Sequence, residues 1–371
     1  MKLLKIIANN YKNCKNNFCI DMTARSKKTS EDKLYELQKV AEELYTFNVN
    51  AIVGKNASGK TSVIELLDCC YTILSTFRLT NKHFDYDNTE ITMYFYYEGN
   101  IYKYYTELKT DLSEVDKALF VNQKLYKKKY FKTNVKKIFD DDFEKVEVNG
   151  ELPEDTSILF FVLKKASSRA VYFDCYGKDV DTYNMIFKVM KNYNIPVEVL
   201  LNIIQVFDET IEEFSMIDEH NFDITINGSK MILSDKELLY RLSSGTTKGL
   251  LLYIYVYASL KNGFDLIIDE IENHFHKTLV ENMISLYKDI YANKNKATLI
   301  FTTHYCELLD LFNRGDNIWI TKQTDKIEIK NLYDDFNLRS ELIKSKKFYE
   351  NAFDTAVNYS ALMGLKKMFI K

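Results

Sequence analysis

The sequence predicts an α/β fold in which a mixed sheet with flanking helices is joined to an antiparallel β subdomain. First, the strand-like run FNVNAIVG leads into a glycine and then into a helical pattern. Second, the apolar runs FDLIIDE and ATLIFTTH are separated by a helical segment, which is typical of buried parallel strands. Third, the stretch TEITMYFYYEGNIYKYYTEL is rich in aromatic and β-branched residues, which favours antiparallel strands. A chain of 371 residues, 46% of them hydrophobic, can bury a substantial core.

The other elements follow in chain order. MKLLKIIANN and NNFCIDM predict strands, a charged stretch covers residues 27–43, and residues 62–77 predict a helix with one apolar face. In the β region, Glu98-Gly99-Asn100 predicts a hairpin turn and SILFFVLKK predicts a further strand. Two helices are expected at about 181–193 and 197–216, followed by the hairpin FDITINGSKMIL with its turn at Asn227-Gly228.

The order of these elements predicts two parts. An α/β head is expected over residues 1–335, with an inserted α+β lobe at about 82–234. Residues 336–371 predict a basic helical tail that packs on this head or on a partner.

Composition excludes several classes of protein. The longest uncharged apolar run, residues 249–260, is shorter than the roughly 20 residues of a membrane helix, and no signal sequence opens the chain. We therefore expect a cytoplasmic protein with no membrane partner. Six cysteines without a CxxC pair argue against disulfides and zinc. A net charge of -3 gives no overall attraction to nucleic acid.

The run GKNASGKT, from Gly54 to Thr61, fits the phosphate-loop pattern GxxxxGK[ST] between a strand and a helix. Backbone N–H groups of such a loop point at phosphate oxygens. Lys60 would place its charge on the same oxygens, and Thr61 would offer a hydroxyl to Mg²⁺. We therefore expect ATP and Mg²⁺ as ligands. The predicted nucleotide-binding residues of this loop are Gly54, Asn56, Ala57, Ser58, Gly59, Lys60, Thr61 and Ser62.

Polar residues follow two further buried strands. Asp269 and Glu270 end FDLIIDE, and His304 ends ATLIFTTH. Because the carboxyl ends of parallel strands meet at one sheet edge, these side chains should lie beside the phosphate loop. Asp269 is the predicted magnesium ligand together with Thr61. Glu270 would accept a proton from the attacking water or orient it, and His304 would contact that water or the γ-phosphate, so the predicted catalytic residues are Glu270, His304 and Lys60.

The run RLSSGTTKGL precedes a long apolar helix. Ser243 and Ser244 can cap that helix, and with Gly245 they leave its positive end free for an anion. We predict that these three residues hold the phosphate of a nucleotide bound to another copy of the chain.

Taken together, the phosphate loop, the LSSG signature, the aspartate-glutamate strand end and the histidine, in that order, resemble an ABC-type P-loop ATPase head. The chain is similar to the chromosome-maintenance and recombination ATPases, and most similar to the overcoming-lysogenization-defect type of anti-phage ATPase. In such proteins two heads sandwich ATP, which implies a homodimer or higher homo-oligomer. The resemblance gives Ser243 the signature-serine role and residues 272–274 a loop that couples the two sites. Gln123 and Gln205 are candidates for the family's glutamine loop.

Several absences separate the subfamilies. The phosphate loop and signature lie about 180 residues apart, which is farther than in the transporter ATPases that the family also includes. No coiled-coil arm or CxxC hook is seen, which argues against a chromosome-tethering rod. The 67 residues after His304 are too few for the nuclease domain of the lysogenization-defect proteins, so the effector is expected to be a separate nuclease or toxin. The resemblance thus implies an ATP-hydrolysing switch in anti-phage defence, and the alternative is a DNA-binding repair or recombination ATPase.

Two other features bear on partners. The run from Lys124 to Lys137 holds seven lysines and three aromatic residues, a combination that suits nucleic acid, although the acidic DDDFE after it could pair with the lysines. His274 and His276 alternate like a metal pair, but loop and packing roles are favoured.

Overall fold

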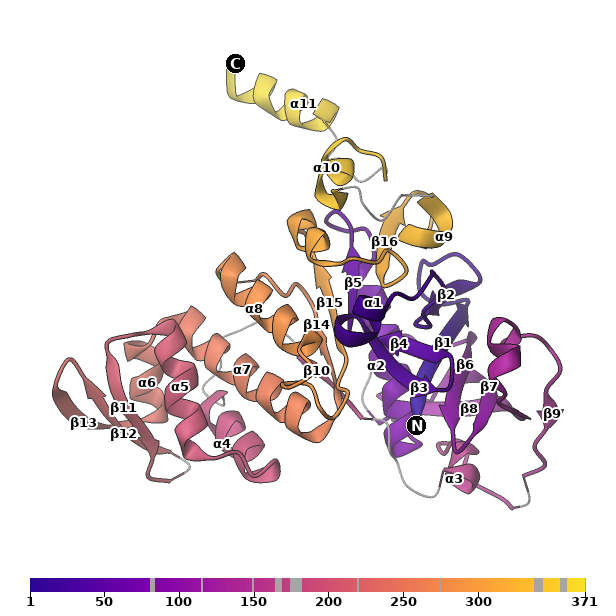
Figure 1. Ribbon diagram of the computed structural model, residues 1–371, viewed down its shortest axis with the longest axis horizontal. Helices are drawn as coiled ribbons and strands as arrows, with labels where there is room; N and C mark the ends of the chain where they lie inside the picture. The colour runs from indigo at the N-terminus through magenta and orange to yellow at the C-terminus, as the bar shows by residue number, and fades with distance from the viewer. Residues whose placement is uncertain are drawn as a thin grey trace.

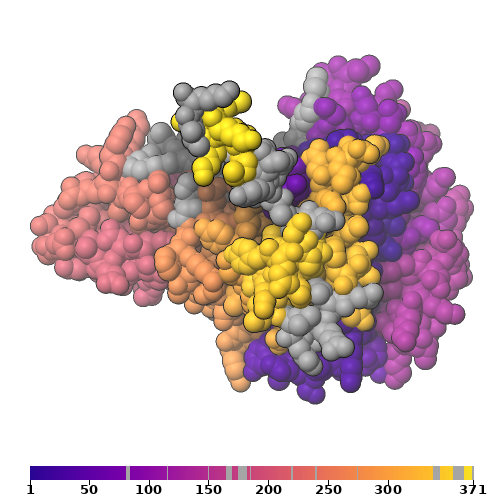
Figure 2. Space-filling view, turned by 90° about the horizontal axis from the view of Figure 1, so that it is seen from above, coloured from indigo at the N-terminus to yellow at the C-terminus, as the bar shows by residue number. Residues whose placement is uncertain are grey.

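The computed structural model describes residues 1–80, 84–114, 116–148, 150–163, 169–173, 182–218, 220–273, 275–336, 343–353 and 359–370. Two six-stranded sheets form the body of the molecule, and a smaller lobe extends from one side (Figure 1). Figure 2 shows the same lobe as a protrusion beside the body. The predicted mixed α/β fold is therefore confirmed.

The sheet that carries the site is mostly parallel. Its strands lie in the order β10 (Ala170–Phe173), β14 (Asp265–Ile268), β15 (Leu299–Thr303), β5 (Val49–Val53), β16 (Ile318–Gln323) and β17 (Ile327–Asn331). Neighbours run parallel except β17, which pairs antiparallel with β16. Strands β5, β14 and β15 are buried along their whole length because both faces are covered, which explains their continuous apolar sequences.

The two faces of this sheet belong to different cores. Val49, Ala51 and Val53 of β5 pack with helices α7 (Ser244–Asn262) and α8 (Lys277–Lys288). Ile52 faces the other way and packs with α2 (Lys60–Thr76) and the second sheet. This alternation along β5 is the two-residue period of a strand, and it places α2 between the two sheets.

The second sheet is antiparallel. Its order is β2 (Phe18–Asp21), β1 (Lys2–Asn9), β6 (Thr89–Tyr97), β7 (Asn100–Thr110), β8 (Ala118–Lys129) and β9 (Glu144–Lys145). The predicted turn between β6 and β7 is present, with positive φ at Glu98 and Gly99, as a tight hairpin requires. The charged stretch contains α1 (Ser30–Tyr35) and β3 (Leu37–Ala41), which forms a small hairpin with β4 (Leu44–Phe47) directly after it.

The lobe combines helices α4 (Thr182–Asn192), α5 (Val197–Phe207) and α6 (Asp235–Arg241) with the sheet β11 (Ile211–Met216), β12 (Asn221–Ile226) and β13 (Ser229–Ser234). The hairpin turn at Asn227-Gly228 is as predicted. The helix expected over 197–216 is wrong beyond Phe207. The Asp208 carboxylate accepts the Thr210 N–H at 3.0 Å and forms a turn, after which β11 pairs with β12.

The strand expected in SILFFVLKK is also wrong. Residues of this run form the short helix α3 (Leu159–Val162). The Ser157 hydroxyl, which donates to Tyr104 Oη at 2.9 Å, also accepts the Leu159 N–H at 3.3 Å. This local bond offers the backbone a helical start in place of a sheet partner.

The chain after β17 is helical where it is described. Helix α9 (Leu332–Phe336) is followed by α10 (Lys344–Tyr349), which packs on the 3₁₀ helix η2 (Cys306–Leu311). Lys344 Nζ donates to the Phe312 carbonyl at 2.6 Å there. Helix α11 (Tyr359–Ile370) stands away from the body (Figure 1). Among the described helices, none is long and apolar enough to cross a bilayer.

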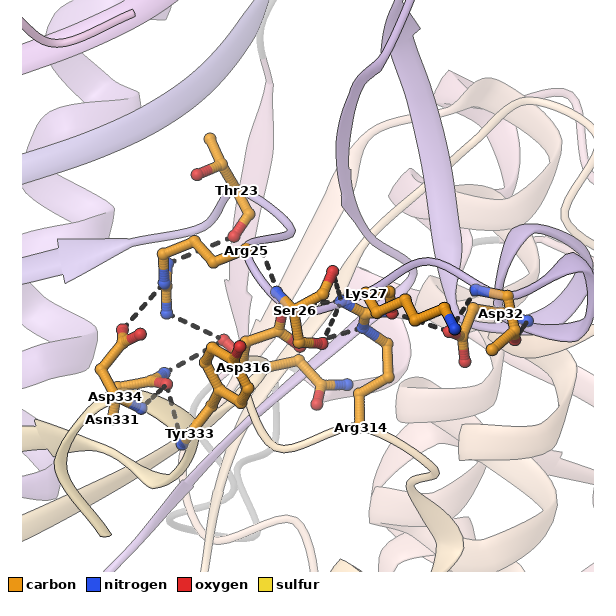
Figure 3. Close-up of polar contacts among 12 residues, drawn as sticks. Thr23, Arg25, Ser26, Lys27, Asp32, Arg314, Asp316, Asn331, Tyr333 and Asp334 are labelled. Carbon is orange, nitrogen blue, oxygen red and sulfur yellow. Dashed lines mark hydrogen bonds and ion pairs between the residues drawn. The ribbon is translucent and has the colours of Figure 1, made fainter. Parts of the chain in front are cut away.

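A buried ionic network joins segments far apart in the sequence (Figure 3). Arg314 contacts Asp316 at 2.7 Å and Asp32 at 2.9 Å, and all three side chains are at least nine-tenths buried. Asp316 also accepts the backbone N–H groups of Arg25 and Ser26. The network thus fixes residues 25–32 against the connection that leads into β16.

Candidate functional site

The phosphate loop connects β5 to α2, as predicted. A Cβ at Gly54 would lie 2.3 Å from Ser58 Oγ and 2.4 Å from Thr321 Oγ1, so only glycine fits there. Gly59 has φ 96° and immediately precedes α2, with Ile327 against it. The Ser58 hydroxyl lies 2.7 Å from that of Thr321 on β16, which anchors the loop to the sheet.

Lys60 turns its ammonium back over this loop. Lys60 Nζ lies 3.1 Å from the Gly54 carbonyl, 3.2 Å from the Lys55 carbonyl and 3.3 Å from His304 Nδ1. Burial lowers the pKa of the Lys60 ammonium, although Glu270, Asp269 and Glu272 act in the opposite direction. None of these three hydrogen-bond partners is an anion. A phosphate bound beside Lys60 would supply one at close range.

Asp269 is fully buried at the end of β14, next to the start of α2. Its Oδ2 accepts the Thr61 hydroxyl at 2.8 Å. Mg²⁺ prefers hydroxyl and carboxylate oxygens and usually takes only one or two of them from the protein. The pair formed by Thr61 and Asp269 therefore fits the ion.

Glu270, His304 and Lys60 form a continuous chain of contacts. His304 Nε2 lies 3.1 Å from Glu270 Oε1, while His304 Nδ1 faces Lys60 Nζ. An ammonium only donates, so Nδ1 accepts and the ring proton is assigned to Nε2, which donates to Glu270. The histidine thus aims the carboxylate of Glu270 at the mouth of the loop.

Two further residues hold these groups: Thr302, which sequence reasoning missed, and Glu272, which was expected only as part of a coupling loop. The Thr302 hydroxyl accepts the Glu270 N–H at 2.6 Å and donates to Asp269 Oδ1. Glu272 accepts the His304 N–H through Oε1. The position of Thr302, two residues before the strand-end histidine, gave no signal of this role, because the acidic pair that it contacts follows the neighbouring strand.

The groups converge on one pocket of about 580 Å³. Glu270 and His304 face the phosphate loop across it, and Ile327 supplies an apolar wall. Of the predicted residues, the loop from Asn56 to Ser62, Glu270 and His304 all line this pocket, while Gly54 and Asp269 are buried and do not line it. The lining is Asn56, Ala57, Ser58, Gly59, Lys60, Thr61, Ser62, Glu270, His304 and Ile327.

The serine turn, formed by Ser243, Ser244 and Gly245, is not part of this pocket. Ser243 caps α7, and its hydroxyl accepts the Thr246 N–H at 3.0 Å. Ser243 and Ser244 are exposed, and Gly245 is half-buried. None of the three lines the pocket of its own chain. The predicted cap is confirmed for Ser243, whereas Ser244 is the first residue of α7. The contact with a second chain stays a prediction.

The remaining candidates have local partners. Gln123 accepts from Tyr104 Oη at 2.7 Å, and Gln205 donates to the Ile211 carbonyl, so both serve the packing of their own elements. His276 caps α8 by accepting the Thr278 N–H, while His274 lies outside the described residues. No group of three or more His, Cys, Asp or Glu side chains forms a metal site in the described ranges. The five cysteines that the structure describes are unpaired.

The basic run from Lys124 to Lys137 is partly neutralised. Lys128 pairs with Asp142 of the acidic run that follows. Lys103 on the adjacent strand pairs with Asp141 at 2.7 Å. Lys124, Lys127 and Lys129 are exposed on β8.

A glycine-rich loop between a parallel strand and a helix, with a buried aspartate beside its threonine, defines a P-loop nucleotide-binding domain. The family model described as "AAA domain, putative AbiEii toxin, Type IV TA system" matches residues 49–310, and the chain belongs to this family of AAA ATPases. The chain is also similar to a solved structure entitled "Crystal structure of the SmcHead bound to the C-winged helix domain of ScpA". That match has 12% identity, covers 90% of this chain and 98% of the other, and has a TM-score of 0.47. No curated protein sequence matches the chain.

Proposed function

We propose that this protein is an ATP-hydrolysing switch that dimerises around ATP and controls a separate effector in bacterial anti-phage defence. The observation that carries the proposal is the chain from Lys60 through His304 to Glu270 at the rim of a phosphate-loop pocket. It brings a cation for phosphate and a candidate base for water into one cavity. Membership in an AAA family supports the same class of reaction.

Each residue has a role in this proposal. The loop N–H groups and Lys60 bind the β- and γ-phosphates, so Lys60 exchanges its internal contacts for phosphate oxygens. Thr61 and Asp269 hold Mg²⁺, which supplies charge neutralisation on those phosphates. Glu270 accepts the proton of the attacking water, and His304 keeps the carboxylate directed at that position.

The exposed serine turn supports the dimeric part of the proposal. Ser243 lies at the N-terminus of the 19-residue helix α7, away from the pocket of its own chain. A helix N-terminus favours anions, and this one is accessible to a second molecule. In the proposed dimer it closes the open side of the partner's pocket.

Two variants test the catalytic assignment. Glu270→Gln should keep ATP binding and lower kcat by about 100-fold or more, since the amide cannot accept the proton. Lys60→Ala should weaken ATP binding by about 10- to 100-fold through loss of a charge-assisted contact. Phosphate release and ATP titration measure the two effects. Wild-type turnover in Glu270→Gln would remove that residue from the mechanism, and unchanged affinity in Lys60→Ala would remove the loop assignment.

The effector is proposed to be encoded beside this chain. The family description names a toxin of a type IV toxin-antitoxin system, which supports an effector pathway without identifying the effector. Phage challenge of cells that carry the locus should show protection that is lost with Lys60→Ala. Equal plaque counts with both forms would contradict the defence role and leave the ATPase assignment intact.

The alternative function is a DNA-binding repair or recombination ATPase. Lys124, Tyr105 and Tyr126 line a groove of about 450 Å³ on the antiparallel sheet. Lys127 and Lys129 are exposed on β8 and, because side chains alternate along a strand, they lie on the opposite face of the sheet from Lys124 and Tyr126. Lysines with aromatic rings suit a nucleic-acid backbone and its bases. Duplex-stimulated hydrolysis that disappears in Lys127→Glu/Lys129→Glu would favour this function, and indifference to DNA would favour the switch.

A further inference from the structure

Thr302 is fully buried in β15, between β14 and β5. Its hydroxyl has two partners on the chain segment that follows β14. The hydroxyl accepts the Glu270 N–H at 2.6 Å and donates to Asp269 Oδ1. A carboxylate only accepts and an N–H only donates, so these two partners fix the direction of the hydroxyl proton.

Thr302 also holds the backbone on the far side of Glu270. The Thr302 carbonyl accepts the Ile271 N–H at 3.0 Å. Glu270 lies between these two bonds with φ 50°, a left-handed conformation that is uncommon for any residue with a side chain. The two bonds from one threonine therefore hold Glu270 in the conformation from which its carboxylate reaches His304.

The same hydroxyl orients the other carboxylate. With Asp269 Oδ1 engaged by Thr302, Oδ2 faces the Thr61 hydroxyl at 2.8 Å. Oδ2 is thus the oxygen presented where Mg²⁺ is proposed to bind. Mutation of a residue that hydrogen-bonds to a metal ligand typically lowers metal affinity by about 10- to 100-fold.

We infer that Thr302 is a positioning residue that sets both Asp269 and Glu270, and so couples magnesium affinity to the alignment of the water-activating carboxylate. The inference rests on the proposed ATPase function and deepens it. Thr302 does not line the pocket, so it acts through the two carboxylates.

The test is Thr302→Val, which keeps the shape of the side chain and removes the hydroxyl. The half-saturating Mg²⁺ concentration for hydrolysis should rise about tenfold. The Mg²⁺-dependent gain in thermal stability with bound ATP should shift to higher Mg²⁺ by the same factor, whereas ATP affinity in EDTA should stay within about twofold. Thr302→Ser, which restores the hydroxyl, should recover most of the Mg²⁺ response.

Thr303→Val is the matched control. Thr303 is equally buried on the same strand, but its hydroxyl accepts the Tyr305 N–H at 2.9 Å and contacts neither carboxylate. This variant should show a similar loss of thermal stability and keep the wild-type Mg²⁺ response. If Thr302→Val does not fold, Thr302→Cys, whose thiol is a weak hydrogen-bonding group, replaces it.

A wild-type Mg²⁺ response in Thr302→Val, or in Thr302→Cys where the valine variant does not fold, would overturn the inference while the wild-type protein still hydrolyses ATP. A wild-type protein that binds no ATP would overturn the proposed function and this inference with it. The two failures are therefore distinguished by the wild-type titration.

Discussion

At the scale of single residues, the phosphate loop depends on a glycine that is surrounded rather than exposed. A Cβ at Gly54 would lie 2.3 Å from Ser58 Oγ, 2.4 Å from Thr321 Oγ1 and 2.8 Å from the Thr321 carbonyl. Gly54→Ala should therefore displace the loop from β16, cost about 1 to 3 kcal/mol of unfolding free energy and weaken ATP binding. Urea unfolding and ATP titration measure the two losses.

Gly315→Ala is the control for that substitution. Its Cβ would meet Tyr333 at ordinary van der Waals distances, 3.6 and 3.7 Å. It should leave both the unfolding free energy and the ATP affinity near wild type. Equal losses in the two variants would mean that the crowding at Gly54 is not what shapes the loop.

The sequence identified the residues whose chemistry is encoded in a local motif. The loop through Lys60 and Thr61 could be predicted because glycine spacing and flanking elements specify it. Thr302 and Glu272 could not, because their importance comes from which side chains face each other across neighbouring strands. Register of that kind depends on the whole sheet, and a single buried threonine in an apolar run carries no sign of it.

At the scale of elements, the strongly periodic segments were predicted and the local exceptions were not. The phosphate-loop helix, the buried parallel strands and the hairpin at Asn227-Gly228 have patterns that length and turn chemistry specify. The segment that became β11 reads as helix because Ile211 and Phe214 are three residues apart, yet both are buried against β12 and α5. The three-residue spacing suits a helix, but pairing with β12 makes this segment a strand. The division of the chain at residue 335 and the inserted lobe at 82–234 stay predictions.

The ionic network of Figure 3 joins two elements, and its stability should depend on pH. Burial alone would raise the pKa of Asp316, but the Arg314 guanidinium and the N–H groups of Ser26 and Arg25 outweigh it and lower the pKa. A carboxyl whose pKa is lower in the folded state stabilises the fold above its unfolded pKa of about 4, and that stability is lost as the pH falls below this value.

Asp316→Asn should therefore destabilise the protein at pH 7 by about 3 to 5 kcal/mol, because Arg314 keeps only Asp32 as a charged partner. The difference from wild type should shrink as the pH falls below about 4. Asp334→Asn is the control in the same network. Its side chain is 45% exposed and pairs with Arg25, so its loss should cost about 1 kcal/mol or less. Urea unfolding across pH measures the unfolding free energy of both variants. Similar losses in the two would contradict a stabilising role for the buried pair of Arg314 and Asp316.

At the scale of the whole molecule, one chain holds the parts of the proposed switch in separate places. The pocket lies at the carboxyl edge of the parallel sheet, and the Ser243 turn lies at the start of the helix that carries the lobe. Leu250 and Leu252 of that helix share a core with Val49 and Ala51 of the strand that leads to the phosphate loop. A partner's phosphate bound at Ser243 would therefore contact the N-terminus of α7. The same helix packs against β5, the strand that leads to the phosphate loop of the chain that contains Ser243.

Ser243→Asp tests whether the dimer forms through this turn. Aspartate caps helices as well as serine does, so the fold of α7 and ATP binding by the single chain should be preserved. Its carboxylate would face the partner's γ-phosphate, and like charges at that distance oppose association. In a Glu270→Gln background with ATP, light scattering should report a dimer for Ser243 and for Ser243→Thr, which keeps the hydroxyl, and a monomer for Ser243→Asp. An undiminished dimer in Ser243→Asp would place the contact between copies elsewhere on the molecule.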